Sequence, residues 1–167
     1  MSEQQNSLLP FYKGWGTYQE LLIKAIELLP LDQLSLRAAP HLRSIGENAL
    51  HIVGCRAYWF TGFLGEDCDE EMKVYAGWNK VALTLGAPVP TAAELAQGLD
   101  CTWQFMADCL ARWSPADMHQ TFPDDWDGKQ VDLSRAWVVW HVIEHDLHHG
   151  GELSFTLGMH GLTGIDI

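Results

Sequence analysis

The sequence predicts an all-α protein in which residues 1–167 form one four-helix bundle domain. Three observations support this fold class. Four long segments carry apolar residues at helical spacing, no segment shows a convincing strand pattern, and one long crossover separates the second predicted helix from the third. Helices that each have one apolar face bury those faces by packing side by side, and 167 residues suit a single domain.

The first predicted helix covers about residues 10–29 and ends at Pro30, which cannot continue a helix. The second begins after Ser44, whose hydroxyl can cap the helix while Glu47 completes a capping box three residues later. Its apolar face continues to about Leu64. These two segments have clear start or stop signals.

Residues 66–71 are an acidic run that we expect to be a solvated loop, and a short helix is expected between this run and Pro88. Thr91 and Glu94 repeat the capping-box pattern, and helical spacing of apolar residues continues to about Trp113. The third long helix is therefore well marked.

Residues 114–132 contain two prolines and the pair Asp127–Gly128, which predict an irregular connection or a small hairpin. The fourth helix is expected from about Asp132 to Leu157, with Gly158 at its end.

Composition excludes several classes of function. The chain carries 22 acidic and 10 basic residues, a net charge of −12, which repels nucleic-acid phosphates and anionic membrane surfaces. The four cysteines form no C-x-x-C pair, as expected for a reduced cytoplasmic protein. Trp59, Trp137 and Trp140 are expected to lie in the core.

Five ionisable residues of the fourth predicted helix share one face. At about 100° per residue they fall within a sector of about 100°. They are His141, His145, His148, His149 and Glu152. Apolar neighbours imply that part of this stripe faces inward or into a cleft, where neutral imidazoles suit a divalent metal.

Helix geometry limits the ligand set. Histidines four residues apart can reach one ion, whereas His141 and His149 are about 12 Å apart along the helix. The pair is therefore either His141 with His145 or His145 with His149, and a third ligand must come from another helix. His51 is the candidate in the second predicted helix.

Two segments resemble the DinB-like family. HVIEHDLHHGGEL at 141–153 is similar to that family's last-helix signature, and SIGENALHIVGCRAYW at 44–59 is similar to its second-helix pattern. The resemblance implies an up-down-down-up bundle, often a homodimer, with a divalent metal such as Zn or Ni held by three histidines. Carried onto this sequence, those ligands are His51, His145 and His149.

The sequence departs from the family pattern at two positions. Gly150 stands where many members have arginine, which removes a possible anion contact, and Glu152 stands where many have glutamine. Glu152 could orient a ligand imidazole through a hydrogen bond.

Other side chains could line the same pocket without binding the ion. Glu47 and Cys55 lie four residues either side of His51, and His141 and His148 flank the pair on the last helix. Glu47, Glu144 and Glu152 are the candidates for a general base, and the sequence does not choose among them.

Three imidazoles leave coordination positions open, which is typical of a catalytic site. The resemblance implies either a metal-dependent hydrolase or an S-transferase that uses a low-molecular-weight thiol such as bacillithiol or mycothiol, acting on a small-molecule substrate. The alternatives are a non-catalytic bundle that binds a metal or small ligand and a structural bundle with incidental histidines. A metalloprotease-like use of His145-Asp146-x-x-His149 is disfavoured, because aspartate is one methylene shorter than the usual glutamate.

Overall fold

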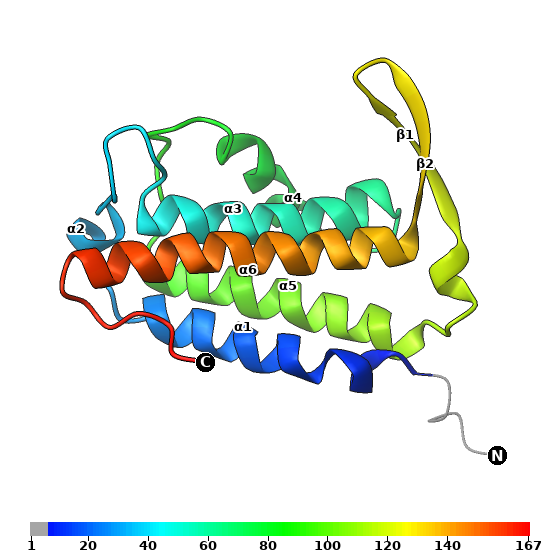
Figure 1. The fold of residues 1–167 in the computed structure, drawn as a ribbon, viewed down its shortest axis with the longest axis horizontal. Helices are drawn as coiled ribbons and strands as arrows, with labels where there is room; N and C mark the ends of the chain where they lie inside the picture. The colour runs from blue at the N-terminus through cyan, green and yellow to red at the C-terminus, as the bar shows by residue number, and fades with distance from the viewer. Residues whose placement is uncertain (1–6) are drawn as a thin grey trace.

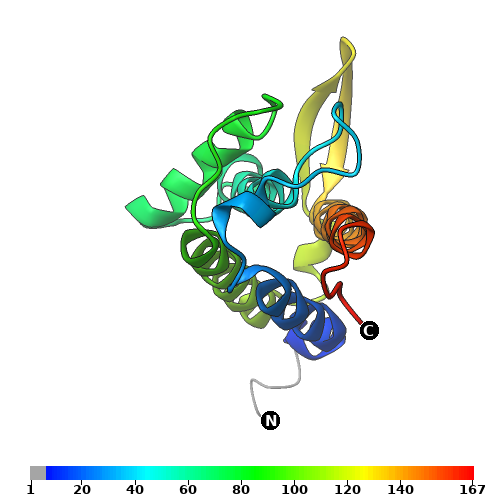
Figure 2. The same ribbon diagram turned by 90° about the vertical axis from the view of Figure 1, so that its left-hand side faces the viewer.

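The computed structural model describes residues 7–167, whereas the predicted domain also includes residues 1–6, which lie outside the described residues. The described chain is mostly helical, as predicted, and four long helices surround the core, as the end-on view in Figure 2 shows. They are α1 (Lys13–Ile26), α3 (Ile45–Ala57), α5 (Ala92–Arg112) and α6 (Arg135–Met159).

In Figure 1, α1 and α6 run from right to left, and α3 and α5 run from left to right. Contacts along the helices agree with these directions. Trp15 of α1 donates a hydrogen bond to Asp146 of α6, and one turn further along both helices Tyr18 lies against Gly150. The connection from α3 to α5 crosses the length of the bundle and carries a fifth helix, α4 (Glu70–Val81), which packs outside α3 (Figures 1 and 2).

Both predicted capping boxes are present. The Ser44 hydroxyl accepts a hydrogen bond from the Glu47 backbone N–H at 3.2 Å, and the Glu47 carboxylate accepts one from the Ser44 backbone N–H at 2.7 Å. Thr91 and Glu94 exchange the same two bonds at the start of α5. These caps satisfy backbone donors that a helix start leaves free.

Several element boundaries differ from those predicted. The second predicted helix ends as a π-helical segment, Tyr58–Phe63, that continues α3. The last two residues of the predicted acidic loop belong to α4, because the Asp69 side chain accepts a hydrogen bond from the Met72 backbone N–H and caps that helix. The short helix expected before Pro88 is confirmed.

Short helical segments complete the connections. They are η2 (Leu9–Tyr12), α2 (Leu31–Leu34) and η4 (Asp117–His119).

The expected absence of strands was wrong, whereas the hairpin alternative for the last connection is confirmed. Strand β1 (Thr121–Trp126) pairs antiparallel with β2 (Lys129–Ser134). The two-residue turn has Asp127 at φ 51° and Gly128 at φ 76°, the left-handed conformations that favour this residue pair in tight hairpins. Residues 129–134 are therefore used by the sheet, and α6 begins at Arg135 instead of near residue 132.

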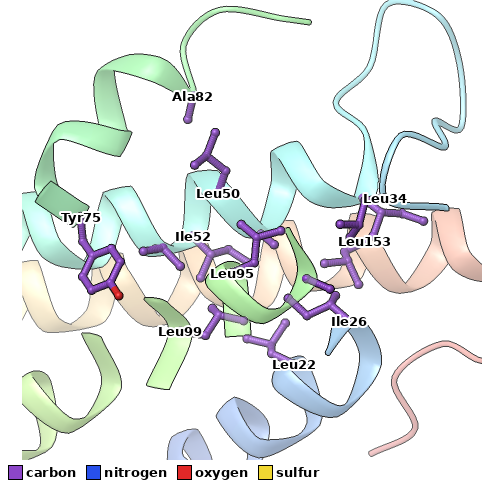
Figure 3. Packing of buried hydrophobic residues seen from close by; sticks show 14 of the residues in the cluster. Leu22, Ile26, Leu34, Leu50, Ile52, Tyr75, Ala82, Leu95, Leu99 and Leu153 are labelled. Atoms are coloured by element: carbon purple, nitrogen blue, oxygen red, sulfur yellow. The ribbon is translucent and has the colours of Figure 1, made fainter. Parts of the chain in front are cut away.

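The apolar core fills the space between the long helices. Leu22, Leu95, Leu99 and Leu153, which come from α1, α5 and α6, are each at most 1% exposed and pack together (Figure 3). A second cluster around Phe60 fills the end nearer the hairpin. Burial of this many aliphatic side chains supplies the main driving force for helix packing.

Trp140 corrects one sequence expectation, since it is 58% exposed instead of buried. Trp59 and Trp137 are partly buried and pack against the second apolar cluster. No helix among residues 7–167 is both long enough and apolar enough to span a membrane.

A charged pair lies at the centre of the bundle, with both side chains fully buried. Arg56 of α3 donates from Nε to Asp146 Oδ2 of α6 at 2.8 Å. The same guanidinium donates to Gln19 of α1 and to the Leu99 carbonyl of α5, and Trp15 of α1 donates to Asp146 Oδ2 at 2.7 Å. All four long helices therefore meet at one hydrogen-bonded network.

We expect Arg56→Met and Asp146→Leu each to reduce the free energy of unfolding by about 3–5 kcal/mol, because each leaves an uncompensated buried charge. The double variant should be more stable than either single variant, since it removes both charges. Denaturation by guanidinium chloride, monitored by circular dichroism, measures the free energy of unfolding of the two single variants and the double variant relative to the wild type. Lys73→Met, which removes an exposed ion pair with Glu70, is the control and should leave stability unchanged. Additive losses in the double variant would contradict this account.

Candidate metal centre

Three histidines from two adjacent helices lie together. His51 of α3 faces His145 and His149 of α6, and one ring nitrogen of each lies within 4.8 Å of the others. His51 Nε2 is 3.0 Å from His145 Nε2, and the three ring centroids are 4.4 to 4.6 Å apart. The set predicted by the family resemblance is thus brought together by the antiparallel packing of α3 against α6.

The spacing of these nitrogens suits a metal ion. Two imidazole nitrogens bound to one tetrahedral ion at about 2.0–2.1 Å lie about 3.3 Å apart. The 3.0 Å separation between His51 and His145 is close to that value. A set of imidazole donors with no thiolate suits Zn, Ni and related divalent ions.

Burial keeps the imidazoles neutral. Loss of solvation lowers the pKa of His51 to about 3 and that of His145 to about 2, and it also lowers the pKa of His149. The positive charge of Arg43 acts in the same direction on all three rings. Neutral rings have the free lone pair that a metal requires.

Glu152 contacts the site through His149. Its Oε2 lies 2.7 Å from His149 Nδ1, so the carboxylate can accept that ring's N–H and leave Nε2 free to bind an ion. His148, on the exposed side, lies 3.4 Å from the other carboxylate oxygen. His148, His149 and Glu152 form a second group with close donor atoms, but two of its three members are exposed.

His141 lies beside the site and outside the three-histidine group. Its ring stacks on Trp137 at 4.9 Å between centroids and meets the edge of Trp59 at 4.8 Å. Its Nδ1 is 3.3 Å from Glu144. His141 thus forms part of an aromatic wall that extends from the imidazoles toward the hairpin.

The two residues four positions either side of His51 point to other partners. The Glu47 carboxylate accepts hydrogen bonds from Arg37 and from the backbone N–H groups of Ser44 and Gly86. Cys55 is buried, and loss of solvation and the nearby Asp146 charge both raise the pKa of its thiol. Neither joins the group of close donor atoms.

Asp146 explains why the metalloprotease pattern does not apply. It lies between His145 and His149 in sequence, but it points into the bundle, where it is fully buried and paired with Arg56. It therefore holds α6 against α3 and does not face the imidazoles.

The structure gives a reason for one departure from the family pattern. A Cβ added at Gly150 would lie 2.2 Å from the Tyr18 hydroxyl and 3.0 Å from Leu22. Glycine at this position allows α6 to approach α1 closely, and a larger side chain would force the helices apart.

Two features near the site were not predicted from the sequence. Arg43 lies in the loop before α3, and no periodic pattern marks it as a neighbour of the last helix. The pairing of Arg56 with Asp146 is also invisible in sequence, since 90 positions separate the two residues. The available signal in the sequence was an ionisable residue at helical spacing from an apolar one, Arg56 from Ile52 and Asp146 from Val142.

The sequence model of the DinB superfamily matches residues 17–153, a range that includes all three histidines. The chain belongs to the DinB superfamily. Its fold is similar to the crystal structure of a DinB-like protein from Bacillus cereus ATCC 10987, with a TM-score of 0.72 and 22% sequence identity over 97% of this chain and 98% of that chain. No curated protein matches this DinB superfamily member.

The pKa shifts predict how the metal-free protein responds to acid. His51 and His145 should stay neutral near pH 5 in the folded state, whereas in the unfolded chain they titrate near the ordinary value of 6.5. The unfolded state then binds more protons, so the free energy of unfolding should decrease as pH falls below about 6.5. Ring ¹⁵N chemical shifts of the folded and urea-unfolded protein measure both states. Protonation of both rings near pH 6.5 in the folded protein would contradict the prediction.

Proposed function

We propose that this DinB superfamily protein is a metal-dependent enzyme in which His51, His145 and His149 bind one divalent ion, with Zn and Ni the best candidates. The observation that carries the proposal is the convergence of three imidazoles from α3 and α6, of which His51 and His149 are buried and His145 is half-buried. If the protein were only a structural bundle, there would be no reason for three histidine rings to lie together where they are partly shielded from solvent.

The donor set supports catalysis over a purely structural role for the metal. Structural zinc sites use four protein ligands, whereas three ligands leave a position for substrate. A divalent ion held there would act as a Lewis acid toward an oxygen or sulfur atom of the substrate. His141, Glu144 and His148 line a surface pocket of about 390 Å³ together with two of the proposed ligands, which gives small molecules a route to the imidazoles.

The proposed reaction is S-transfer from a low-molecular-weight thiol or hydrolysis of a small-molecule substrate, as the family resemblance implies. A cytoplasmic location and a homodimer belong to the same proposal. In this proposal the proton transfers fall to Glu144 or Glu152, because Glu144 contacts His141 and Glu152 contacts His149. Thiol-transfer and hydrolysis assays on zinc-loaded and nickel-loaded protein distinguish an enzyme from a binding protein.

Metal content tests the proposed ligand set. We expect about one zinc or nickel ion per chain in the wild-type protein after loading and dialysis, and a large loss of bound metal in His149→Ala. His148→Ala is the matched control, because it changes the neighbouring histidine, whose side chain is 67% exposed, and should retain the metal. Elemental analysis by mass spectrometry gives the stoichiometry. Equal metal content in wild type and His149→Ala would contradict the proposed site.

The role of Glu152 can be tested separately. Replacing the carboxylate that orients His149 should lower metal affinity by about tenfold or more. Glu152→Gln is therefore expected to weaken zinc binding, measured by competition with a chromophoric chelator, while the thermal midpoint of the metal-free protein changes little. Glu144→Gln, which alters the partner of His141, is the control and should bind zinc as the wild type does. Unchanged affinity in both variants would show that Glu152 does not support His149.

A further inference from the structure

A cavity of about 330 Å³ lies beside the histidine group, between the loop before α3, the segment after α4 and the C-terminal half of α6. The loop lies over the same end of the bundle as that half of α6 (Figures 1 and 2). Glu152, whose carboxylate contacts His149, lines the cavity, so the cavity adjoins the proposed metal centre. Its volume is in the range of small-molecule binding sites.

The cavity wall contains one cation without a carboxylate partner. Arg43 lines the cavity and forms no ion pair within residues 7–167. The nearby Glu47 carboxylate is already bound by Arg37, and Glu152 lies against His148 and His149. In a chain with 22 acidic and 10 basic residues, an unpaired guanidinium facing a cavity is a local site for an anion.

One polar residue of the cavity wall, Asn48, has an acceptor oxygen that is unpaired within residues 7–167. It lines the same cavity and is only 2% exposed, yet its Oδ1 accepts no hydrogen bond from the described residues. Buried amides are normally hydrogen-bonded, because leaving a polar group unpaired costs free energy. Because Oδ1 only accepts hydrogen bonds and is shielded from solvent, it needs a donor and not an anion, so the charge preference of the cavity rests on Arg43.

The remaining wall is largely apolar. Leu42, Leu83, Leu85 and Phe155 all line the cavity, and each is at least 44% exposed. A ligand that covers these side chains removes apolar surface from water. The cavity therefore offers one cation, unpaired within the described residues, on one part of its wall and hydrocarbon on the other.

We propose that this cavity binds a small monocarboxylate with an apolar body, whose carboxylate pairs with Arg43 and whose hydrocarbon part packs against Leu83, Leu85 and Phe155. A single cation balances a single negative charge, and the neighbouring Glu152 disfavours a doubly charged group. The use of this cavity as the substrate site of the enzyme rests on the proposed metal centre, whereas carboxylate binding itself does not.

Octanoate is the probe, and octanamide is its neutral counterpart. Binding of each is measured by titration calorimetry. The protein is first treated with a chelator, so that no metal can bind the carboxylate. We expect octanoate to bind wild type at least about tenfold more tightly than octanamide does, and Arg43→Gln to remove that difference. Phe155→Ala should weaken both probes, since it removes part of the apolar wall. Arg112→Gln is the matched control, because Arg112 is an exposed arginine paired with Glu66 away from the cavity.

Equal octanoate affinity in wild type and Arg43→Gln, or equal affinity for the two probes, would overturn the proposal. Octanoate binding that appears only in zinc-loaded protein and is insensitive to Arg43 would overturn it too, since the carboxylate would then be on the metal. Zinc stoichiometry of the same protein preparations after they are reloaded with zinc separates the two proposals. Arg43-dependent binding without zinc uptake refutes the metal centre alone, and zinc uptake without Arg43-dependent binding refutes the carboxylate site alone.

Discussion

The buried contact between Arg56 and Asp146 is the constraint on which the arrangement of the bundle depends. The Asp146 carboxylate accepts hydrogen bonds from Trp15 of α1 and Arg56 of α3, and the Arg56 guanidinium reaches Gln19 of α1 and the Leu99 carbonyl of α5. Apolar packing tolerates small rotations and translations of helices, whereas a desolvated ion pair is stable only when its partners meet. The pair therefore fixes the rotation and register of α3 against α6.

That register is also what brings the histidines together. Asp146 follows His145 directly in α6, and consecutive helical residues point about 100° apart. When Asp146 points inward to Arg56, His145 and His149 are turned toward the outer edge of the α3–α6 contact, where His51 meets them. One turn further along α6, Gly150 permits the close approach to Tyr18 of α1. The inward face of α6 thus fixes the position of this helix in the bundle, while the adjoining face contains His145 and His149 of the proposed metal centre.

Electrostatics distinguish the site from the rest of this acidic chain. The three imidazoles are neutral because burial and the Arg43 charge both disfavour protonation, and they lie in a protein with a net charge of −12. The net negative charge of the chain favours a divalent cation and repels an anionic substrate from most of the surface, whereas the free lone pairs of the neutral rings are what bind the ion. Arg43 gives one part of the wall of the cavity beside the site a positive charge, which allows the two proposed ligands to be adjacent.

The sequence by itself determined the helical class and the two capping boxes, because caps and helical periodicity depend on residues a few positions apart. Periodicity left two histidine pairs open on the last helix, and only the resemblance to the DinB-like family implied the set His51, His145 and His149. The sequence left open whether residues 114–132 form an irregular connection or a hairpin, and the structure has the hairpin. The sequence also did not predict that Trp140 is exposed or that Arg43 lies near the last helix. Only the tertiary structure decided which of Glu47, Cys55, His141, His148 and Glu152 contacts a proposed ligand. The physical reason is that periodicity fixes a helix's rotation only to tens of degrees, whereas long-range contacts such as Arg56 with Asp146 fix it to one value.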